Sequence, residues 1–490
     1  MADSKIRNEI HVFINGVEHR IGGEKAFLPL AQYLRNHSLP GTKVVCAEGD
    51  CGACTVLASK LQQNPEKEIQ WSSFQTINSC IAPMYLFDLG SLVTVEGLET
   101  QEELNEVQEK MRAFHGGQCG YCTPGMVCAL SALAENSQCA GKSISEKKAR
   151  NHLTGNLCRC TGYEPILQAA TNLDLSKWKS LKDRYLTAEQ GNTFASMLKD
   201  SLAIEAGTRR FLAPASLAVA VDQKNQSPEM RLVAGATDLG VLHNKGKSFL
   251  DNVMSLHKIS DTEKIERRAD GVWVGARVTL TQLENFVEST LPELSRLLRI
   301  FASPQIKNQG TLVGNVMNGS PIGDSIPALL ALDAIVHLQS VSGTREVPLS
   351  QFYKAYKVFD VKPNEIATGI LIPVLGSEWK SRFFKVSLRK DLDISAVTFA
   401  ATLKLDGQKI TEARFAMGGV GPTVVRLPEL EKKAQGQNFS EALFADLGKQ
   451  VRTLIKPISD LRASDEYRLK VAENLFKKCH LELEQEIPCP

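Results

Sequence analysis

The chain has 490 residues, and at about 150 residues per domain this length predicts a protein of roughly three domains. A composition of 43% hydrophobic and 23% charged residues is typical of a soluble globular protein and excludes a disordered chain. Because 57 basic residues face 55 acidic ones, giving a formal charge of +2, no overall field draws the chain to nucleic acid or to an anionic membrane, and we expect neither partner.

The first ten residues contain no apolar core of a secretory signal. The most apolar long stretch, residues 326–338, is interrupted by Asp333 and is too short to cross a bilayer. We therefore expect a cytoplasmic protein. In that compartment the twelve cysteines stay reduced, so clustered thiols favour metal ligation over disulfides.

From the N-terminus, residues 10–19 predict two short strands joined at Asn15-Gly16, a strong hairpin signal. Residues 26–36 then carry apolar side chains at helical spacing. A hairpin followed by a helix across it predicts the opening of a β-grasp fold.

Three cysteines follow with the spacing C-x4-C-x2-C, and a fourth stands further on: Cys46, Cys51, Cys54 and Cys80. This spacing is typical of a plant-type [2Fe–2S] cluster. A loop around such a cluster must aim backbone N–H groups inward, and Gly49 and Gly52 allow the tight turns that this needs. A zinc site built on Cys51 and Cys54 is the alternative, although zinc sites normally join two close C-x2-C pairs.

A second domain is predicted to begin near Gly97, with helices over residues 102–114, 126–135, 145–153 and 165–173. Two loops of this small bundle supply two further pairs of thiols, Cys119 with Cys122 and Cys158 with Cys160. Four thiolates suit zinc as well as iron, so the spacing of these pairs alone leaves both metals open.

Three segments carry a resemblance to a known family: residues 46–56 (CAEGDCGACTV), 118–125 (QCGYCTPG) and 157–163 (LCRCTGY). They resemble, in the same order, the two cluster motifs of the xanthine dehydrogenase family of molybdenum hydroxylases. The resemblance implies one [2Fe–2S] cluster on Cys46, Cys51, Cys54 and Cys80 and a second on Cys119, Cys122, Cys158 and Cys160. Asp50 departs from the pattern, because many loops of the family have glycine there.

Past a polar stretch with weak periodicity, an α/β pattern begins that carries two glycine-bearing loops, residues 235–238 and 310–315. Glycines let backbone N–H groups approach a pyrophosphate, but no Rossmann or Walker motif accompanies these loops and alone they are weak evidence. Both loops resemble the FAD loops of the same family. The resemblance implies an FAD site formed by Leu232, Val233, Ala234, Gly235, Ala236, Thr237, Asp238, Phe301, Gly310, Thr311, Gly314, Asn315, Asp324 and Lys385.

The last part of the chain predicts strands over residues 383–388, 394–405 and 410–420, followed by helices over 440–454 and 463–479. With the resemblance, we expect a multidomain α+β protein whose FAD-binding part is of the vanillyl-alcohol-oxidase (PCMH-like) type. The expected parts are a plant-type ferredoxin domain (1–96), a helical [2Fe–2S] domain (97–175), a linker (176–206), an FAD-binding domain (207–376) and a C-terminal flavoprotein domain (377–490). Four cysteines lie outside every motif, and the sequence does not indicate their roles: Cys128, Cys139, Cys479 and Cys489.

The resemblance implies an electron-transfer chain. In this family, electrons leave a substrate at a molybdenum–pterin centre and pass through the helical-domain cluster, the ferredoxin-like cluster and FAD to NAD⁺ or oxygen. No molybdenum-binding portion follows here, so we expect a small subunit of the bacterial type, without catalytic residues of its own. Its large partner would bind molybdopterin and oxidise hypoxanthine and xanthine to urate, in a heterotetramer with two copies of each subunit.

The surface beside Gly120, Tyr121 and Arg159 is the expected contact with that partner. Two alternatives stay open. The chain could serve another molybdenum hydroxylase, acting on an aldehyde, nicotinate or carbon monoxide, or it could be a zinc-stabilised interaction module without enzymatic function.

Overall fold

A computed structural model describes residues 5–63, 68–99, 103–248 and 250–485. Cys489 therefore lies outside the described residues. The chain divides into two compact units: the first comprises Met1–Gln223, Glu229–Ser260 and Ser303–Gly310, and the second comprises Lys224–Pro228, Asp261–Ala302 and Thr311–Pro490. All the cysteines predicted as cluster ligands fall in the first unit.

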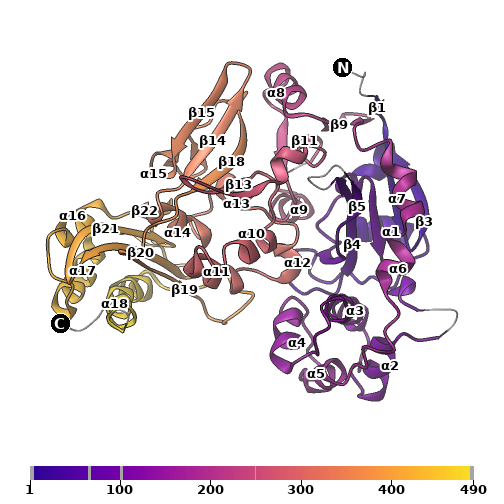
Figure 1. The fold of residues 1–490 in the computed structure, drawn as a ribbon, viewed down its shortest axis with the longest axis horizontal. Helices are drawn as coiled ribbons and strands as arrows, with labels where there is room; N and C mark the ends of the chain where they lie inside the picture. Colours follow the sequence, from indigo (N-terminus) through magenta and orange to yellow (C-terminus); the bar gives the residue numbers. More distant parts are fainter. Residues whose placement is uncertain (1–4, 64–67, 100–102, 249, 486–490) are drawn as a thin grey trace. The chain divides into compact units, whose positions relative to one another are not determined.

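The first domain of the chain is a β-grasp, as its opening hairpin predicted (Figure 1). Asn15 and Gly16 both adopt left-handed backbone angles, with φ of 51° and 85°, as a two-residue hairpin turn requires. The strand order is β3-β2-β7-β4-β5, β2 runs parallel to β7, and β6 pairs with β4. The elements are β2 (Glu9–Ile14), β3 (Val17–Gly22), α1 (Leu30–Asn36), β4 (Thr55–Gln63), β5 (Ile69–Trp71), β6 (Gln75–Asn78) and β7 (Gly90–Val93).

The predicted helix over 26–36 is shorter than expected. A 3-10 turn occupies Gly23–Phe27, and α1 begins only at Leu30. Pro29 explains the delay, because a residue that precedes proline is disfavoured in helical geometry, and Leu28 is extended with φ of −66° and ψ of 145°.

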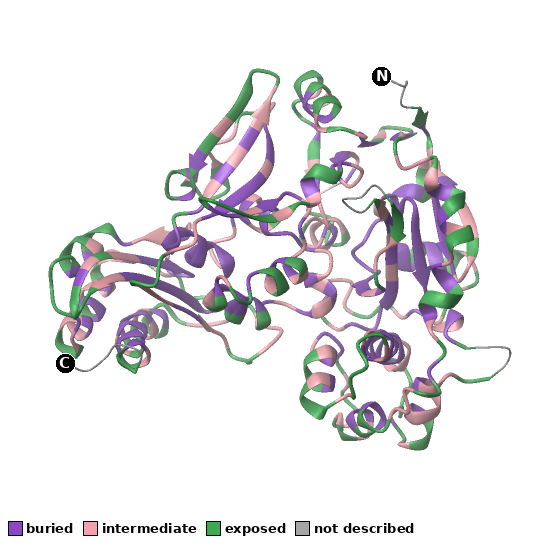
Figure 2. Cartoon of the chain, in the orientation of Figure 1, coloured by how far each residue is buried: buried purple, intermediate pink, exposed green. Residues whose placement is uncertain are grey.

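The second domain is the predicted four-helix bundle, with α2 (Glu106–Ala113), α3 (Thr123–Cys139), α4 (Glu146–Leu153) and α5 (Glu164–Thr171). Figure 2 shows α3 buried over most of its length, and its small side chains allow the other helices to pack around it. Pro124 stands in the first turn of α3, where its missing N–H leaves no hydrogen bond unmade. The two cysteine-bearing loops lead into α3 and α5.

The stretch 176–206, expected to be a linker, contains regular structure: α6 (Leu181–Tyr185), α7 (Ala188–Ala195) and β8 (Ser201–Ala206). Strand β8 belongs to a five-stranded mixed sheet of order β1-β8-β9-β11-β10. The N-terminal strand β1 pairs parallel with β8 and so adds residues from the start of the chain to this sheet. Its other strands are β1 (Ile6–Arg7), β9 (Arg209–Ala213), β10 (Arg231–Val233) and β11 (Asn252–Ser255). The helices α8 (Leu217–Gln226), α9 (Leu239–Asn244) and α12 (Pro304–Lys307) belong to the same part of the fold.

A buried charge network joins this sheet to the β-grasp. The Asp88 carboxylate, with no exposed side-chain surface, accepts hydrogen bonds from Arg7 at 3.0 and 2.5 Å and from Lys258 Nζ at 3.3 Å. Arg7 lies on β1, Asp88 precedes β7, and Lys258 follows β11. Three segments far apart in the chain are thus held by one carboxylate.

Besides a short antiparallel pair, β16 (Tyr353–Ala355) with β17 (Val358–Phe359), the second unit contains two larger antiparallel sheets (Figure 1). The first has the order β12-β13-β18-β14-β15, and α13 packs on β13 and β18. The other strands and helices of this part of the chain are β12 (Ile265–Arg268), β13 (Gly271–Gly275), α10 (Leu280–Phe286), α11 (Pro292–Arg299), α13 (Leu312–Asn318), α14 (Ser325–Ala331), β14 (Ile335–Ser340), β15 (Gly343–Pro348), α15 (Leu349–Phe352) and β18 (Ile366–Ile372).

The second of these sheets forms the C-terminal domain in the order β19-β20-β21-β22, with helices packed on it as predicted. Its elements are β19 (Trp379–Val386), β20 (Val397–Asp406), β21 (Lys409–Gly418), β22 (Val425–Arg426), α16 (Pro428–Ala434), α17 (Glu441–Leu454) and α18 (Asp465–Glu484). Within the described residues, no helix is both long and apolar enough to cross a membrane.

Candidate functional site

The first cysteine loop aims backbone N–H groups at a thiol sulfur, as the cluster chemistry predicts. Cys46 Sγ accepts hydrogen bonds from the N–H groups of Glu48 at 3.4 Å and of Cys51 at 3.5 Å. The loop is tight because Gly49 and Gly52 both have left-handed backbone angles, with φ of 78° and 66°. These angles cost glycine no steric energy. The loop thus directs two backbone N–H groups at the sulfur of one predicted ligand.

Side-chain contacts connect the four thiols of the first set. Cys46 contacts Cys51 and Cys80, and Cys54 contacts Cys80. The hydrogen bond from Cys51 lowers the pKa of Cys46. A two-iron cluster is held by four thiolates, and the contacts that connect all four thiols here fit this arrangement.

The second set forms two pairs of its own. Cys119 contacts Cys160, and Cys122 contacts Cys158. The first pair is exposed and the second is half-buried. Burial, with a contribution from Cys158, raises the pKa of Cys122 to about 12. Among the residues that the structure describes, no group of three or more His, Cys, Asp and Glu side chains is placed to hold one metal ion.

The two cysteine loops touch each other through their backbones. The N–H of Leu157, which precedes Cys158, donates to the carbonyl of Cys51 at 2.9 Å. The Asn156 side chain donates to the carbonyl of Gly52 at 3.0 Å. A Cβ at Gly52 would lie 2.1 Å from the carbonyl oxygen of Gly155, so only glycine permits this approach. The backbone hydrogen bond from Leu157 to Cys51 thus connects the two segments that carry the predicted cluster ligands.

Segment Ser303–Gly310, which leads into the second glycine-bearing loop, packs against both cysteine loops. Gln305 Nε2 donates to Asn156 Oδ1 at 2.7 Å, and Asn308 Nδ2 donates to the carbonyl of Thr76 at 2.9 Å. Ile306 packs on the buried group formed by Cys54, Cys80 and Ile81. The chain just before Gly310 therefore lies against the ligands of the first predicted cluster.

The helix that follows the first glycine-bearing loop also contacts ligands of the first predicted cluster. This loop leads from β10 into α9, whose Val241 packs on Cys54, Cys80 and Ile81. From the end of α9, Asn244 Nδ2 donates to the carbonyl of Cys80 at 2.9 Å.

A Cβ on Gly235 would lie 1.9 Å from the carbonyl oxygen of Gln309, so this position also demands glycine. The predicted FAD residues of this part lie on β10 (Leu232 and Val233) and in the loop after it (Ala234, Gly235, Ala236, Thr237 and Asp238).

In the second unit, Thr311 caps α13 by accepting a hydrogen bond from the N–H of Gly314 at 3.0 Å. Asn315, in the first turn of the same helix, accepts a hydrogen bond from Ser325 at 2.7 Å. Phe301 is buried two residues after the end of α11.

Asp324 and Lys385 form a buried ion pair that the sequence did not predict. Lys385 Nζ donates to Asp324 at 2.7 Å, and the two side chains are 2% and 8% exposed. Ser395 donates to the other oxygen of the carboxylate at 2.5 Å. The structure therefore brings together two predicted site residues that are far apart in sequence and adds Ser395 to them.

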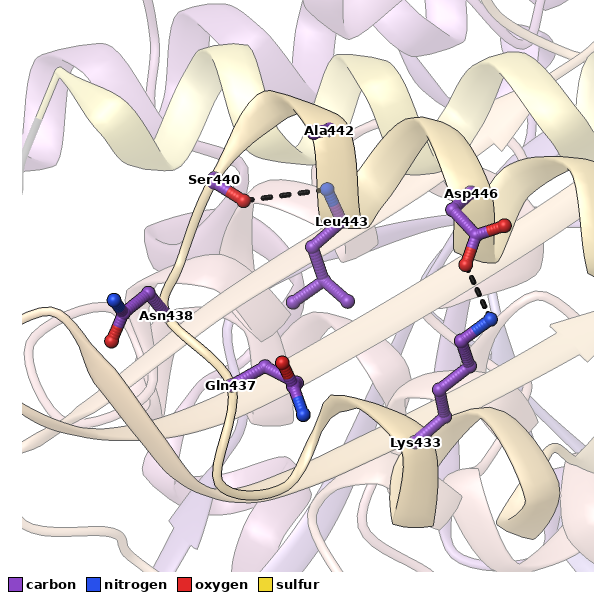
Figure 3. A pocket seen from close by; sticks show the side chains of 7 residues that line it. All are labelled: Lys433, Gln437, Asn438, Ser440, Ala442, Leu443 and Asp446. Carbon is purple, nitrogen blue, oxygen red and sulfur yellow. Dashed lines mark hydrogen bonds and ion pairs between the residues drawn. The ribbon is translucent and has the colours of Figure 1, made fainter.

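A pocket in the C-terminal domain lies between α16 and the start of α17 (Figure 3). The Lys433–Asp446 ion pair spans it, and Ser440 accepts a hydrogen bond from the N–H of Leu443. These polar groups are satisfied within the chain, and none of the predicted site residues lines the pocket.

Comparison with known protein families covers most of the chain. A [2Fe–2S] binding domain matches residues 94–171, which include the second cysteine set. The FAD binding domain in molybdopterin dehydrogenase matches residues 205–375, and the CO dehydrogenase flavoprotein C-terminal domain matches residues 382–483. These three domains fit the iron–sulfur and flavin part of a molybdenum hydroxylase. The multidomain α+β fold expected from the sequence is thereby confirmed.

Individual relatives point the same way. Xanthine dehydrogenase of Oryza sativa is 28% identical over 89% of this chain and 36% of its own length, and xanthine dehydrogenase/oxidase of Gallus gallus is 27% identical over 91% and 38%. The chain thus spans little more than a third of the curated relatives it matches. Among solved structures, CO dehydrogenase from Oligotropha carboxidovorans is 25% identical with a TM-score of 0.53, over 56% of this chain and 97% of that one. Quinoline 2-oxidoreductase from Pseudomonas putida 86 is 25% identical with a TM-score of 0.52, over 56% and 96%.

Proposed function

We propose that this chain is the electron-transfer subunit of a xanthine dehydrogenase. It would receive electrons from a molybdopterin-binding partner and deliver them to NAD⁺ through two [2Fe–2S] clusters and FAD. The contacts that join the second cysteine loop to the first, and the first to Val241 and Ile306 beside the glycine-bearing loops, support this proposal most strongly.

Iron–sulfur clusters supply one-electron steps, and a flavin converts them to the two-electron chemistry of hydride transfer. The residues of this chain would supply the ligands and the connections between them. Leu157 and Cys51 join the two cysteine loops by a hydrogen bond, while Ile306 and Val241 exclude water from the buried pair Cys54 and Cys80. These contacts connect the second cysteine loop to the first, and the first to residues beside the glycine-bearing loops. We therefore propose that electrons pass from the second cluster to the first cluster and then to the flavin.

The entry point for electrons is proposed at the second cysteine set. Cys119 and Cys160 are exposed, and Tyr121 between the cysteines of its loop is 51% exposed. Exposed aromatic side chains are enriched where proteins bind partners. The surface of Gly120, Tyr121 and Arg159 is therefore our candidate for contact with the molybdenum-binding subunit, in a cytoplasmic heterotetramer with two copies of each chain.

The similarity to xanthine dehydrogenases over 85% or more of this chain favours purine oxidation. The solved structures of a CO dehydrogenase and a quinoline oxidoreductase favour the alternative, a subunit with the same plan that serves another molybdenum hydroxylase. Turnover of the co-purified complex with hypoxanthine, xanthine, aldehydes, nicotinate and carbon monoxide separates the two candidates. Activity with a substrate other than a purine would overturn the assignment to xanthine dehydrogenase.

Substitution of Cys160 by serine tests the order of electron flow. We expect one cluster signal to disappear and flavin reduction by substrate to stop, while direct oxidation of NADH by the flavin continues. Cys139→Ser is the matched control, because Cys139 is an exposed cysteine outside both sets. Loss of NADH oxidation in Cys160→Ser, or an equal effect of Cys139→Ser, would contradict the proposed order.

A further inference from the structure

The turn after the second pair of cysteines is held in an unusual backbone conformation. Tyr163 has a left-handed φ of 70°, which is rare for a residue other than glycine, and it stands at the N-cap of α5. Its phenolic oxygen accepts a hydrogen bond from the N–H of Cys158 at 2.9 Å. Strained backbone of this kind persists where the surrounding contacts fix it, and it clusters at functional sites. The hydrogen bond between Cys158 and Tyr163 therefore closes a turn over residues 158–163 and fixes its conformation.

Thr161 lies inside this turn with its hydroxyl between two groups. Thr161 Oγ1 accepts a hydrogen bond from the N–H of Tyr163 at 3.2 Å, and it lies 3.2 Å from Cys158 Sγ. A hydroxyl has one proton to donate. Because a backbone N–H already occupies one of its lone pairs, the Thr161 proton is directed to the remaining neighbour, the sulfur of Cys158.

Metal ligation removes the ambiguity about which atom donates. A cysteine that binds a metal does so as a thiolate, which has no proton. Cys158 would then only accept, and the bond would run from Thr161 to the sulfur as a charge-assisted hydrogen bond. The left-handed turn at Tyr163 fixes the N–H that orients the Thr161 hydroxyl.

We propose that Thr161 is a positioning residue that raises the reduction potential of the second cluster by donating a hydrogen bond to Cys158. This inference rests on the proposed function, because it takes Cys158 to be a ligand of a [2Fe–2S] cluster. A cluster gains negative charge on reduction, so a donor at a ligand sulfur stabilises the reduced form more than the oxidised form. Hydrogen bonds to the sulfurs are among the recognised determinants of cluster potentials. The consequence is a cluster that accepts electrons more readily from the partner subunit.

The test is a potentiometric titration of the intact protein, followed by electron paramagnetic resonance, in the wild type and three variants. Thr161→Val keeps the shape of the side chain but removes the hydroxyl, Thr161→Ala removes it without adding a methyl group, and Thr161→Ser retains it. For Thr161→Val we expect the reduction equilibrium of the second cluster to fall about tenfold, which is about 59 mV for one electron. Thr161→Ser should stay close to the wild type, and the first cluster should keep its potential in every variant.

Each other outcome decides against the inference. An unchanged potential in Thr161→Val, an equal shift of both clusters, or a shift in Thr161→Ser as large as in Thr161→Val would show that the hydroxyl does not set the potential. If Thr161→Val fails to hold the cluster, Thr161→Ala carries the same expectation. Loss of the cluster from both variants, with Thr161→Ser intact, would assign Thr161 to cluster assembly instead. A wild type without any signal from a second cluster would overturn the proposed function rather than this inference alone.

Discussion

Replacement of Asn156 by alanine should loosen the junction between the two cysteine loops. The buried Asn156 side chain donates to the carbonyl of Gly52 at 3.0 Å and to Thr55 Oγ1 at 3.1 Å, and it accepts from Gln305 Nε2 at 2.7 Å. A buried hydrogen bond contributes about 1 kcal/mol net, so the loss of three should destabilise this part of the protein by about 3 kcal/mol. At about 2–4 °C per kcal/mol for 150–250 residues, the melting temperature should fall by about 6–12 °C.

Thermal unfolding followed by the visible circular dichroism of the clusters measures this change where it occurs. Asn151→Ala is the matched control, because Asn151 is an exposed asparagine on neighbouring α4. We expect the control to melt with the wild type. If Asn156→Ala melted within about 1 °C of Asn151→Ala, the hydrogen bonds of Asn156 would not hold the junction, and the reasoning from its burial would be refuted.

Two further predictions concern glycine and charge in the first unit. Gly52 has φ of 66°, and a Cβ there would lie 2.1 Å from the Gly155 carbonyl oxygen. Gly52→Ala should therefore push the cysteine loops apart and slow reduction of the first cluster at least about tenfold, as measured by rapid mixing. Gly141→Ala, whose φ is 59° but whose Cβ would meet nothing within 4 Å, should leave that rate unchanged, and equal rates in both variants would contradict the account. Asp88→Asn should lower the free energy of unfolding by about 3–5 kcal/mol, since it removes the buried negative charge that Lys258 and Arg7 share.

The Asp88 variant should also change the pH dependence: burial alone would raise the pKa of Asp88, but Lys258 and Arg7 hold it below its ordinary value of 3.8. A carboxyl with a lowered pKa stabilises the fold above its unfolded pKa and loses this contribution as pH falls through the folded value. The difference in urea midpoint between wild type and variant should therefore be constant above about pH 4 and shrink below it, and a difference that grows on acidification would disprove the sign.

The sequence predicted those features whose cause is local. Asn15-Gly16 specifies its own turn, and Gly49 and Gly52 take the left-handed angles that a tight cysteine loop requires. Helix starts were less accurate where proline intervened, as at Pro29 before α1. Local sequence signals also predicted that the cysteine pairs of the second domain lie in loops of a helical bundle, and these loops lead into α3 and α5.

Contacts between distant segments could not be predicted in the same way. Nothing in the pattern of residues 176–206 shows that β8 joins a sheet with β1, because register in that sheet depends on both partners. Asn156, Gln305 and Ser395 were missed, since a polar side chain that is satisfied only across the fold leaves no periodic signal along the chain. The Asp324–Lys385 ion pair joins residues of two different domains and likewise has no local cue. The ligand roles of the cysteines and the FAD residues remain predictions.

Metal and flavin content, measured on anaerobically purified protein together with electron paramagnetic resonance after reduction, tests the central claim most directly. The proposal predicts about four irons and one FAD per chain, with two distinct [2Fe–2S] signals. A colourless protein that contains zinc in place of iron would contradict it and would favour a zinc-stabilised interaction module.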